Sequence, residues 1–400
     1  MILPRAAWQS RKGMAALLRA LGAGEGQTRY VGGCVRDTLL GLPVSDVDFA
    51  TRLAPEEVMR RLKAARIKAV PTGLAHGTVT AIVEGVPFEV TTLRRDVATD
   101  GRRATIAYTE DWREDAARRD FTINALSADP TRLAIFDYFG GEADLAARRV
   151  RFIGDPLTRI AEDHLRILRF FRFHARFGQG EPDPSGLEAC AARANDLMAL
   201  SRERIADELT KLLALPEPAA TVSLMVERGI LRPVLPEIDE AGAARLERLV
   251  EREKAVGAPP DPLRRLAALL PADAEIAAAV AARLRLSNKA QRRLVTAARR
   301  DGDAPVPEVL AYRLGRDEAV DRMLLGDVDP AIVRVLDGWK RPRLAVGGGD
   351  LIALGLEAGP AVARTLQAIE REWSESGFAG EAEQRAIARR HVDQALADRQ

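Results

Sequence analysis

The stretch RYVGGCVRDTLLGLPVSDVDFAT, residues 29–51, combines three local signals within a short length of chain. RYVGG is typical of a β-strand that runs into a two-glycine turn, and CVRDTLLG of a short helix that ends at Gly41. VSDVDFAT alternates polar and apolar residues, as a strand with one buried face does. A glycine turn before a helix lets backbone N–H groups approach a phosphate group. The stretch therefore predicts a phosphate site followed by a strand that carries acidic residues.

Asp46 and Asp48 are the acidic residues of that strand. Alternate residues of a strand point to the same face, so we expect the two carboxylates to converge. Such a pair favours a cation, and carboxylate oxygens suit Mg²⁺. Glu89 stands isolated among apolar residues in VPFEVTTL and is the candidate third carboxylate. Carboxylates around divalent cations allow polymerases to activate a hydroxyl group and stabilise leaving pyrophosphate, although Asp-x-Asp alone more often caps a turn.

The remaining chain predicts a mixed α/β segment followed by helices. APEEVMRRLKAARI is expected to form a helix that begins at Pro55, and GTVTAIVEGVPFEVTTL a hairpin that turns at Glu84-Gly85. The charged residues from Arg94 to Arg113 predict a long loop. From Asp155 onward the pattern is helical almost throughout. We therefore expect a head at residues 1–153, a helical neck and body at 154–257, and further helical body and tail at 258–400.

Composition limits the class of protein. A chain of 400 residues is too long for one ordinary core, and 47% hydrophobic with 30% charged residues is the balance of a soluble globular protein. The net charge of +2 does not by itself indicate a nucleic-acid partner. Cys34 and Cys190 are the only cysteines, and the four histidines lack zinc-ligand spacing. No leader or membrane-spanning run is recognisable, so we expect a cytoplasmic protein without a membrane partner.

A second cluster of charge occurs in EDHLRILRFFRF, residues 162–173. Glu162, Arg166 and Arg169 are spaced to share one face of a helix, and Asp163 is adjacent. Cytosine and adenine both present an amine donor beside a ring-nitrogen acceptor, which matches a carboxylate beside a guanidinium. Asp163 and Arg166 could therefore select CTP and ATP without a template. The alternative is a solvated face held by salt bridges.

Together these motifs resemble the tRNA nucleotidyltransferase and poly(A) polymerase family. GGCVRDTLLGLPVSDVDFAT resembles its nucleotidyltransferase motif, and further resemblances follow in family order over about half of the chain. They are EVTTLRRD for the strand of the third carboxylate, RRDFTINAL (118–126) for the link between head and neck, EDHLRILRFFRF for the base-reading helix, and SRERIADELTKLL (201–213) for the next neck motif. The segment PRLAVGGGDLIALGLEAGPAVARTL resembles part of the family's tail.

The resemblance implies an α+β, polymerase β-like head followed by an all-α neck, body and tail. It implies addition of CMP, CMP and AMP to the 3′ end of tRNA, with CTP and ATP as substrates and Mg²⁺ as cofactor. Asp46 and Asp48 would hold the metal, and Glu89 would assist activation of the 3′-hydroxyl. Asp120 and Asn124 would orient head and neck. The expected nucleotide-binding residues are Gly32, Gly33, Arg36, Arg119, Asp163, Arg166, Arg169 and Arg172.

Several alternatives share these motifs. A poly(A) polymerase or a partial CC- or A-adding enzyme would carry all of them, although EDHLR in place of EDPVR and the lack of a strongly basic C-terminal extension favour CCA addition. A non-catalytic RNA-binding regulator would not need the complete carboxylate set. A small-molecule nucleotidyltransferase would not explain the long helical tail.

Overall fold

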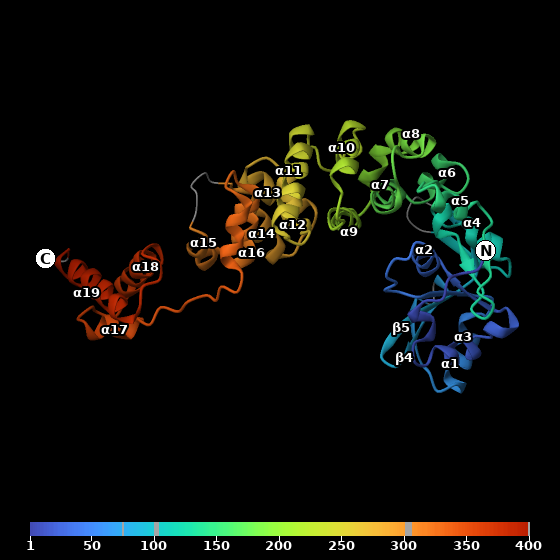
Figure 1. Ribbon diagram of the computed structural model, residues 1–400, viewed down its shortest axis with the longest axis horizontal. Coiled ribbons are helices and arrows are strands. Elements are labelled where there is room, and N and C mark those ends of the chain that lie inside the picture. The colour runs from blue at the N-terminus through green and yellow to red at the C-terminus, as the bar shows by residue number, and fades with distance from the viewer. Residues whose placement is uncertain (74–75, 100–103, 301–305, 399–400) are drawn as a thin grey trace. The chain divides into compact units, whose positions relative to one another are not determined.

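The computed structural model describes residues 1–73, 76–99, 104–300 and 306–398. The chain forms two compact units, Met1–Glu240 and Ala241–Gln400 (Figure 1). Each unit has its own buried core. The finer domain boundaries at 153 and 257 stay predictions.

Unit 1 begins with a seven-stranded mixed sheet in the order β3-β4-β5-β2-β1-β8-β9. Its only parallel pair is β2 with β5, and this pair sets Asp48 opposite Glu89. The mixed sheet confirms the α+β class expected for the head. The strands are β1 (Thr28–Val31), β2 (Asp48–Thr51), β3 (Lys68–Gly73), β4 (Thr78–Val83), β5 (Val86–Thr92), β8 (Ser127–Ala128) and β9 (Ile135–Phe136).

Several local predictions for the head are confirmed. α2 (Gly33–Leu39) follows β1 after a turn at Gly32, and α3 (Pro55–Ala64) begins at its proline. Glu84 and Gly85 form the β4–β5 turn with φ of 50° and 80°. One detail is wrong: β2 begins only at Asp48, so Asp46 lies in the irregular segment before the strand. The remaining helices of the head are η1 (Ala7–Ser10), α1 (Met14–Ala20), η2 (Ala23–Glu25), α4 (Trp112–Ala117) and η4 (Thr122–Asn124).

The long loop expected from Arg94 to Arg113 is wrong for most of its length. β6 (Arg94–Thr99) and β7 (Ala104–Tyr108) pair with each other as an antiparallel hairpin, and α4 follows. Residues 100–103 lie outside the described residues. The two arms bond to one another through the backbone groups that face each other.

The rest of unit 1 is helical, as predicted. The helices are α5 (Gly141–Ala146), α6 (Pro156–Glu162), α7 (Arg166–Phe177), α8 (Pro184–Ala192), η5 (Ala194–Ala199), α9 (Arg202–Leu213) and α10 (Ala219–Glu227). The single base-reading helix expected at 162–173 is wrong. Asp163 has extended backbone angles, φ −151° and ψ 106°, and separates α6 from α7. An aromatic cluster that includes Phe121, Phe152 and Phe170 fills the interior beside α7.

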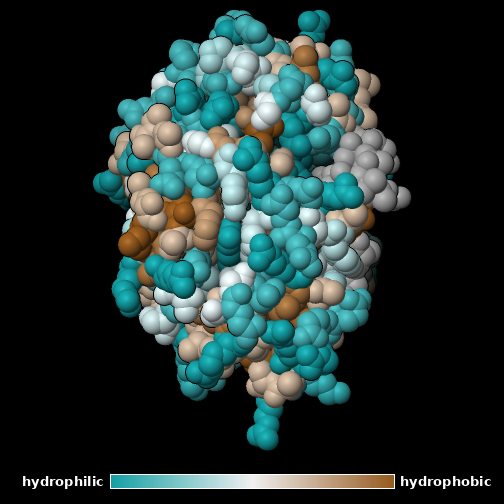
Figure 2. All heavy atoms as spheres, turned by 90° about the vertical axis from the view of Figure 1, so that its right-hand side faces the viewer, coloured by the Kyte–Doolittle hydropathy of each residue, from teal (hydrophilic) through white to brown (hydrophobic). Residues whose placement is uncertain are grey.

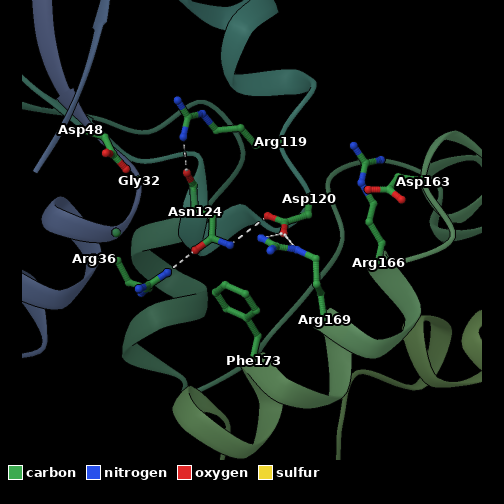
Figure 3. Close-up of a pocket in the computed structure, with 11 residues that line it drawn as sticks. Gly32, Arg36, Asp48, Arg119, Asp120, Asn124, Asp163, Arg166, Arg169 and Phe173 are labelled. Atoms are coloured by element: carbon green, nitrogen blue, oxygen red, sulfur yellow. Dashed lines mark hydrogen bonds and ion pairs between the residues drawn. The ribbon is translucent and has the colours of Figure 1, made fainter. Parts of the chain in front are cut away.

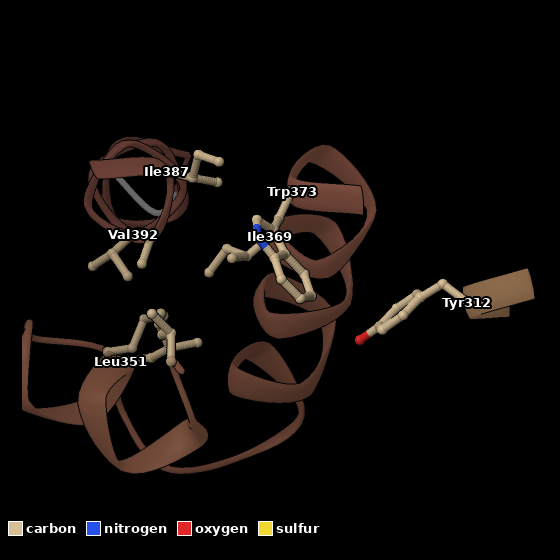
Figure 4. Close-up of a cluster of buried hydrophobic side chains, with 9 residues drawn as sticks. Tyr312, Leu351, Ile369, Trp373, Ile387 and Val392 are labelled. Atoms are coloured by element: carbon tan, nitrogen blue, oxygen red, sulfur yellow. The ribbon is translucent and has the colours of Figure 1, made fainter. Parts of the chain in front are cut away.

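Unit 2 is wholly helical in its described residues. The helices are α11 (Glu240–Val256), α12 (Pro262–Leu269), α13 (Ala274–Arg283), α14 (Asn288–Ala298), α15 (Pro307–Leu314), α16 (Arg316–Leu325), η6 (Pro330–Leu336), α17 (Gly348–Ala353), α18 (Pro360–Glu375) and α19 (Glu381–Ala397). Gly359-Pro360 starts α18, as expected from sequence. The last three helices pack through Leu351, Ile369, Trp373, Ile387 and Val392, with Tyr312 of α15 against Trp373 (Figure 4).

The surface is largely polar on the face that Figure 2 shows, where apolar residues form small separate patches. Cys34 and Cys190 are both free and buried. A search of the described ranges finds no helix with the length and apolar character needed to cross a membrane.

Candidate active site

A cavity of about 380 Å³ lies where the head meets the first neck helices of unit 1 (Figure 3). It brings together most of the residues predicted from sequence, although they are spread over more than 130 positions of the chain. Asp46, Glu89 and Arg172 are not among its lining residues. The lining residues are Gly32, Gly33, Arg36, Asp48, Arg119, Asp120, Asn124, Asp163, Arg166, Arg169 and Phe173.

One of the three predicted carboxylates, Asp48, lines the head side of this cavity, and the other two lie near it. Asp48 stands at the first position of β2, directly opposite Glu89 of β5, and exposed Asp46 lies two residues before it. Burial, followed by the charge of Glu89, raises the pKa of Asp48 to about 6, and Asp46 adds to the shift. The nearby Arg119 guanidinium opposes the shift but does not cancel it. Asp48 therefore lies where a bound cation would favour its charged form.

The donor set fits a divalent cation that is shared with a substrate. Within the described ranges, no three potential ligand side chains already converge as a metal-binding group. Mg²⁺ usually takes only one or two protein carboxylates and completes its coordination with water and substrate phosphates. Asp46 and Asp48 can supply two such carboxylates, and Asp48 lines a cavity that has room for a substrate. These residues therefore fit a divalent metal ion as cofactor.

The glycine turn lies beside Asp48, because Val31, the residue before Gly32, pairs with Asp48. Gly32 has φ of 67°, and a Cβ atom there would lie 3.0 Å from Nη1 of Arg119. A larger residue would be strained and would crowd Arg119. The Gly32 N–H already donates to the Leu126 carbonyl oxygen at 3.0 Å, so this amide is engaged by the fold. Of the two amides expected to approach a phosphate, that of Gly33 is the better candidate.

A chain of hydrogen bonds connects α2 of the head with α7 of the neck. Arg36 donates from Nη1 to the Asn124 side-chain oxygen, and Asn124 donates to Asp120 at 2.9 Å. The other oxygen of Asp120 accepts from Nη2 and Nε of Arg169 at 2.5 and 2.8 Å. Figure 3 shows this path along one side of the cavity. The predicted role of Asp120 and Asn124 in orienting head and neck agrees with these contacts.

Asp120 carries a stable negative charge. Burial opposes its ionisation, but the charge of Arg169 and the hydrogen bonds from Asn124 and Arg169 outweigh burial and hold its pKa at about 2. Arg169 lines the cavity and also forms an ion pair with Asp120, and its role in nucleotide binding stays a prediction.

The two predicted base-selecting residues both line the cavity, but each also has a partner in the neck. Asp163 accepts from Arg204 Nη2 at 3.0 and 3.1 Å, and from the Leu165 N–H at 3.1 Å. Arg166 donates to Glu162 at 2.5 Å and to two main-chain carbonyl oxygens of the segments before it. These contacts fix both side chains at the neck side of the cavity. Arg204 belongs to the segment 201–213, which resembles the next neck motif, and it contacts Asp163 of the segment 162–173.

Comparison with known proteins agrees with this arrangement. A family model described as "Poly A polymerase head domain" matches residues 28–151, and one described as "Probable RNA and SrmB- binding site of polymerase A" matches 181–241. The mitochondrial CCA tRNA nucleotidyltransferase 1 of Mus musculus is 34% identical over 388 residues, covering 92% of this chain and 87% of that protein. The CCA-adding enzyme of Limosilactobacillus fermentum is 31% identical over 372 residues, covering 88% and 90%.

The chain belongs to the tRNA nucleotidyltransferase and poly(A) polymerase family. Its fold matches the crystal structure of Bacillus stearothermophilus CCA-adding enzyme in complex with CTP with a TM-score of 0.74 at 28% identity, covering 97% of this chain and all of the other. The Thermotoga maritima CCA-adding enzyme complexed with tRNA shares the fold, with a TM-score of 0.69 at 19% identity. The chain is therefore an enzyme of the nucleotidyltransferase class.

Arg172 departs from the expectation for a nucleotidyltransferase of this family. It does not line the cavity, and its Nε donates to Glu208 of α9 at 2.6 Å. The reason is that Glu208 is only 3% exposed and requires a charged partner. Sequence reasoning missed Glu208, although it shares one helical face with the apolar residues Ile205, Leu209 and Leu212. An acid on such a face is the signal that could have revealed it.

Proposed function

We propose that this chain adds CMP, CMP and AMP to the 3′ end of tRNA, using CTP and ATP. One observation supports the proposal most strongly: a single cavity is bordered by Gly33 and Asp48 of the head and by Asp163 and Arg166 of the neck. A nucleotide in it can meet phosphate-binding and base-reading groups at the same time. Selection by protein side chains needs no template. Relatives named CCA-adding enzymes, and their structures with CTP, ATP and tRNA, agree with this activity.

We assign the metal to Mg²⁺, held by Asp46 and Asp48. When bound, such an ion supplies positive charge to the triphosphate and lowers the pKa of the attacking hydroxyl group. Glu89 would assist activation of the 3′-hydroxyl from its position opposite Asp48. A single nucleotide site would serve both CTP and ATP, because both bases present the same donor and acceptor pair.

The remaining assignments divide the nucleotide between the two walls of the cavity. Arg36, Arg119 and the Gly33 amide would hold the triphosphate. Asp163 would accept the exocyclic amine of the base and Arg166 would donate to the ring nitrogen, with Arg204 fixing the orientation of Asp163. Arg169 would act through Asp120 rather than on the nucleotide.

Each part of the chain would then have its own task. The head at 1–153 carries out the chemistry, and the neck and body at 154–257 select the base and bind RNA. The helical body and tail at 258–400 hold the tRNA. We expect the protein in the cytoplasm, since two buried free thiols suit a reducing compartment.

The test uses a tRNA transcript that lacks its CCA end, incubated with Mg²⁺ and CTP, ATP or both. We expect two added residues with CTP alone and three with both nucleotides, and no extension of a tRNA that already ends in CCA. Sequencing of the product identifies the order. A long adenosine tail would indicate a poly(A) polymerase, and a stop after two cytidines a CC-adding enzyme. Addition of adenosine only to a tRNA ending in CC would indicate an A-adding enzyme, and no incorporation a regulator.

A further inference from the structure

The ring of Phe173 lies among three guanidinium groups at the cavity. The ring centroid is 5.4 Å from the central carbon of Arg36, 5.2 Å from that of Arg169 and 4.6 Å from that of Arg172. All three distances fall within the range of cation–π attraction. Phe173 lines the cavity and is only 6% exposed, so water screens these contacts little. Figure 3 shows the ring between Arg36 and Arg169.

Each of the three arginines also has a carboxylate partner. The pairs are Arg36 with Asp37 at 2.7 Å, Arg169 with Asp120 at 2.5 Å, and Arg172 with Glu208 at 2.6 Å. All three carboxylates are buried, with 3–8% exposure. The ring is thus surrounded by guanidinium–carboxylate pairs whose charges balance. Two of the pairs also meet directly, because Arg169 Nη1 lies 3.7 Å from Glu208 Oε1. The ring contacts the guanidinium groups of all three pairs.

The position of the ring matters because Arg36 and Arg169 belong to different walls. Arg36 is on α2 beside the glycine turn, whereas Arg169 is on α7 one turn after Arg166. The bonds through Asn124 and Asp120 link the two arginines on one side, and the ring of Phe173 contacts both. A shift of the ring would therefore change the orientation of both guanidinium groups.

We propose that Phe173 is a positioning residue for the incoming nucleotide. Its ring orients the guanidinium groups of Arg36 and Arg169. It thereby keeps the side of the cavity that holds the triphosphate aligned with the side that reads the base. The proposal rests on the proposed nucleotide site. In this proposal Arg36, Asp163 and Arg166 contact the nucleotide. Phe173 does not contact it and acts only by positioning neighbouring side chains.

Phe170 provides a matched control on the same helix. It is fully buried and packs against Phe152 at 5.4 Å and Phe171 at 5.4 Å. In the described parts of the chain, no guanidinium is recorded over its ring, in contrast to Phe173. Phe173 also packs against Phe121 at 5.2 Å and Phe177 at 5.7 Å. A change that acts only through packing should therefore affect both positions alike.

The experiment replaces Phe173 in the full chain with phenylalanines that carry one, two and three ring fluorines, and repeats the series at Phe170. Fluorination weakens the negative face of the ring while its size stays nearly constant. The readouts are kcat and KM for CTP and for ATP at saturating tRNA, KM for tRNA, and CTP affinity by calorimetry. We expect KM for both nucleotides to rise stepwise to about tenfold in the position-173 series, with KM for tRNA unchanged and little effect in the position-170 series. F173L should match the largest effect and exceed F170L.

Two results would overturn the proposal. One is an unchanged nucleotide KM and CTP affinity across the position-173 series; the other is an equal effect in both series, which would assign Phe173 to packing alone. If F173L does not fold, the fluorinated series decides the question, because it retains the ring. Failure of the unsubstituted protein to extend tRNA would refute the proposed function instead, and CTP affinity would still report on Phe173.

Discussion

Asp48 and Asp120 line the same cavity, yet their pKa values move in opposite directions. Asp120 faces Arg169 and Asn124, and its pKa is held at about 2. Asp48 is partly buried near Glu89 and Asp46, and its pKa is raised to about 6. A carboxylate that is already paired with a cationic side chain stabilises the fold. One whose charge the protein opposes is suited to a cation that arrives with the substrate.

Asp46→Ala and Asp48→Ala should each abolish nucleotide incorporation while folding and tRNA binding persist. Removal of one carboxylate relieves repulsion in the metal-free protein, so thermal stability should not fall. Incorporation, tRNA affinity and melting temperature are measured together, with Asp207→Ala, an exposed site paired only with Lys211, as the control. Turnover above about a tenth of the unsubstituted rate, a barrier difference of only about 1.4 kcal/mol, would contradict the metal assignment.

Asp163→Ala and Arg166→Ala should weaken discrimination against UTP and lower the use of CTP and ATP. The carboxylate both accepts the exocyclic amine and repels the uracil carbonyl, and each bidentate base contact contributes roughly 1–3 kcal/mol of discrimination. The measurement is incorporation of each of the four nucleotides under identical conditions. An equal decrease for all four would instead mean that the two residues serve only as a scaffold, through Arg204 and Glu162.

The elements whose geometry depends on local residues were predictable. The glycine turn, α3 and the β4–β5 hairpin follow from signals within a few residues, and the structure has all of them. The break between α6 and α7 was not predictable, because Arg204, which lies 41 residues later, pairs with Asp163 in its extended conformation. The spacing of Glu162 and Arg166 fits a continuous helix equally well.

The β6–β7 hairpin was missed for a different reason. Its many charged residues obscure the β-branched residues Val97, Thr99, Thr105 and Ile106, which favour strands. Within the site, the sequence motifs predicted the charged residues that they contain. They did not predict a role for Asp37, Glu208 or Phe173. Asp37, Glu208 and Phe173 each contact a helix that is distant in sequence, and such contacts leave no local pattern.

Gly85→Ala should lower the free energy of unfolding by about 1–2 kcal/mol. Gly85 has φ of 80° in the β4–β5 turn, where a Cβ atom is strained although no neighbour lies within 4 Å of it. Gly24→Ala is the matched control, because that site is equally open but lacks the left-handed conformation. Urea unfolding of both variants gives the comparison. Equal stability of the two would show that the turn tolerates a side chain.

Glu253→Ala should destabilise unit 2 by about 3–5 kcal/mol, the cost of breaking a buried ion pair from one side. Glu253 of α11 is 1% exposed and accepts from Arg264 at 2.7 Å and from Arg265 at 2.8 Å, both on α12. Its loss leaves two buried guanidinium groups without this partner. Glu251→Ala, on the same helix but with a side chain 67% exposed, should change stability by less than about 0.5 kcal/mol. Similar melting curves for the two variants would refute the argument.

At the scale of the whole molecule, every residue that lines the cavity belongs to unit 1. Unit 2 contains a separate core and a cluster of buried ion pairs that includes Glu253, Arg264 and Asp321. Because each unit has a core of its own, we expect the two units to respond independently to a ligand.

Saturating CTP should therefore raise the melting temperature of unit 1 and leave that of unit 2 unchanged. Ligand at about 100 times its Kd stabilises the folded state by roughly 2.7 kcal/mol, which corresponds to roughly 5–10 °C for a unit of this size. Differential scanning calorimetry of the full chain, with and without CTP, measures both transitions. Glu253→Ala identifies the transition of unit 2, because that variant should lower it alone. A single transition that moves as a whole with CTP and with Glu253→Ala would mean that the two units unfold together, and that nucleotide binding in unit 1 is energetically coupled to the helices of unit 2.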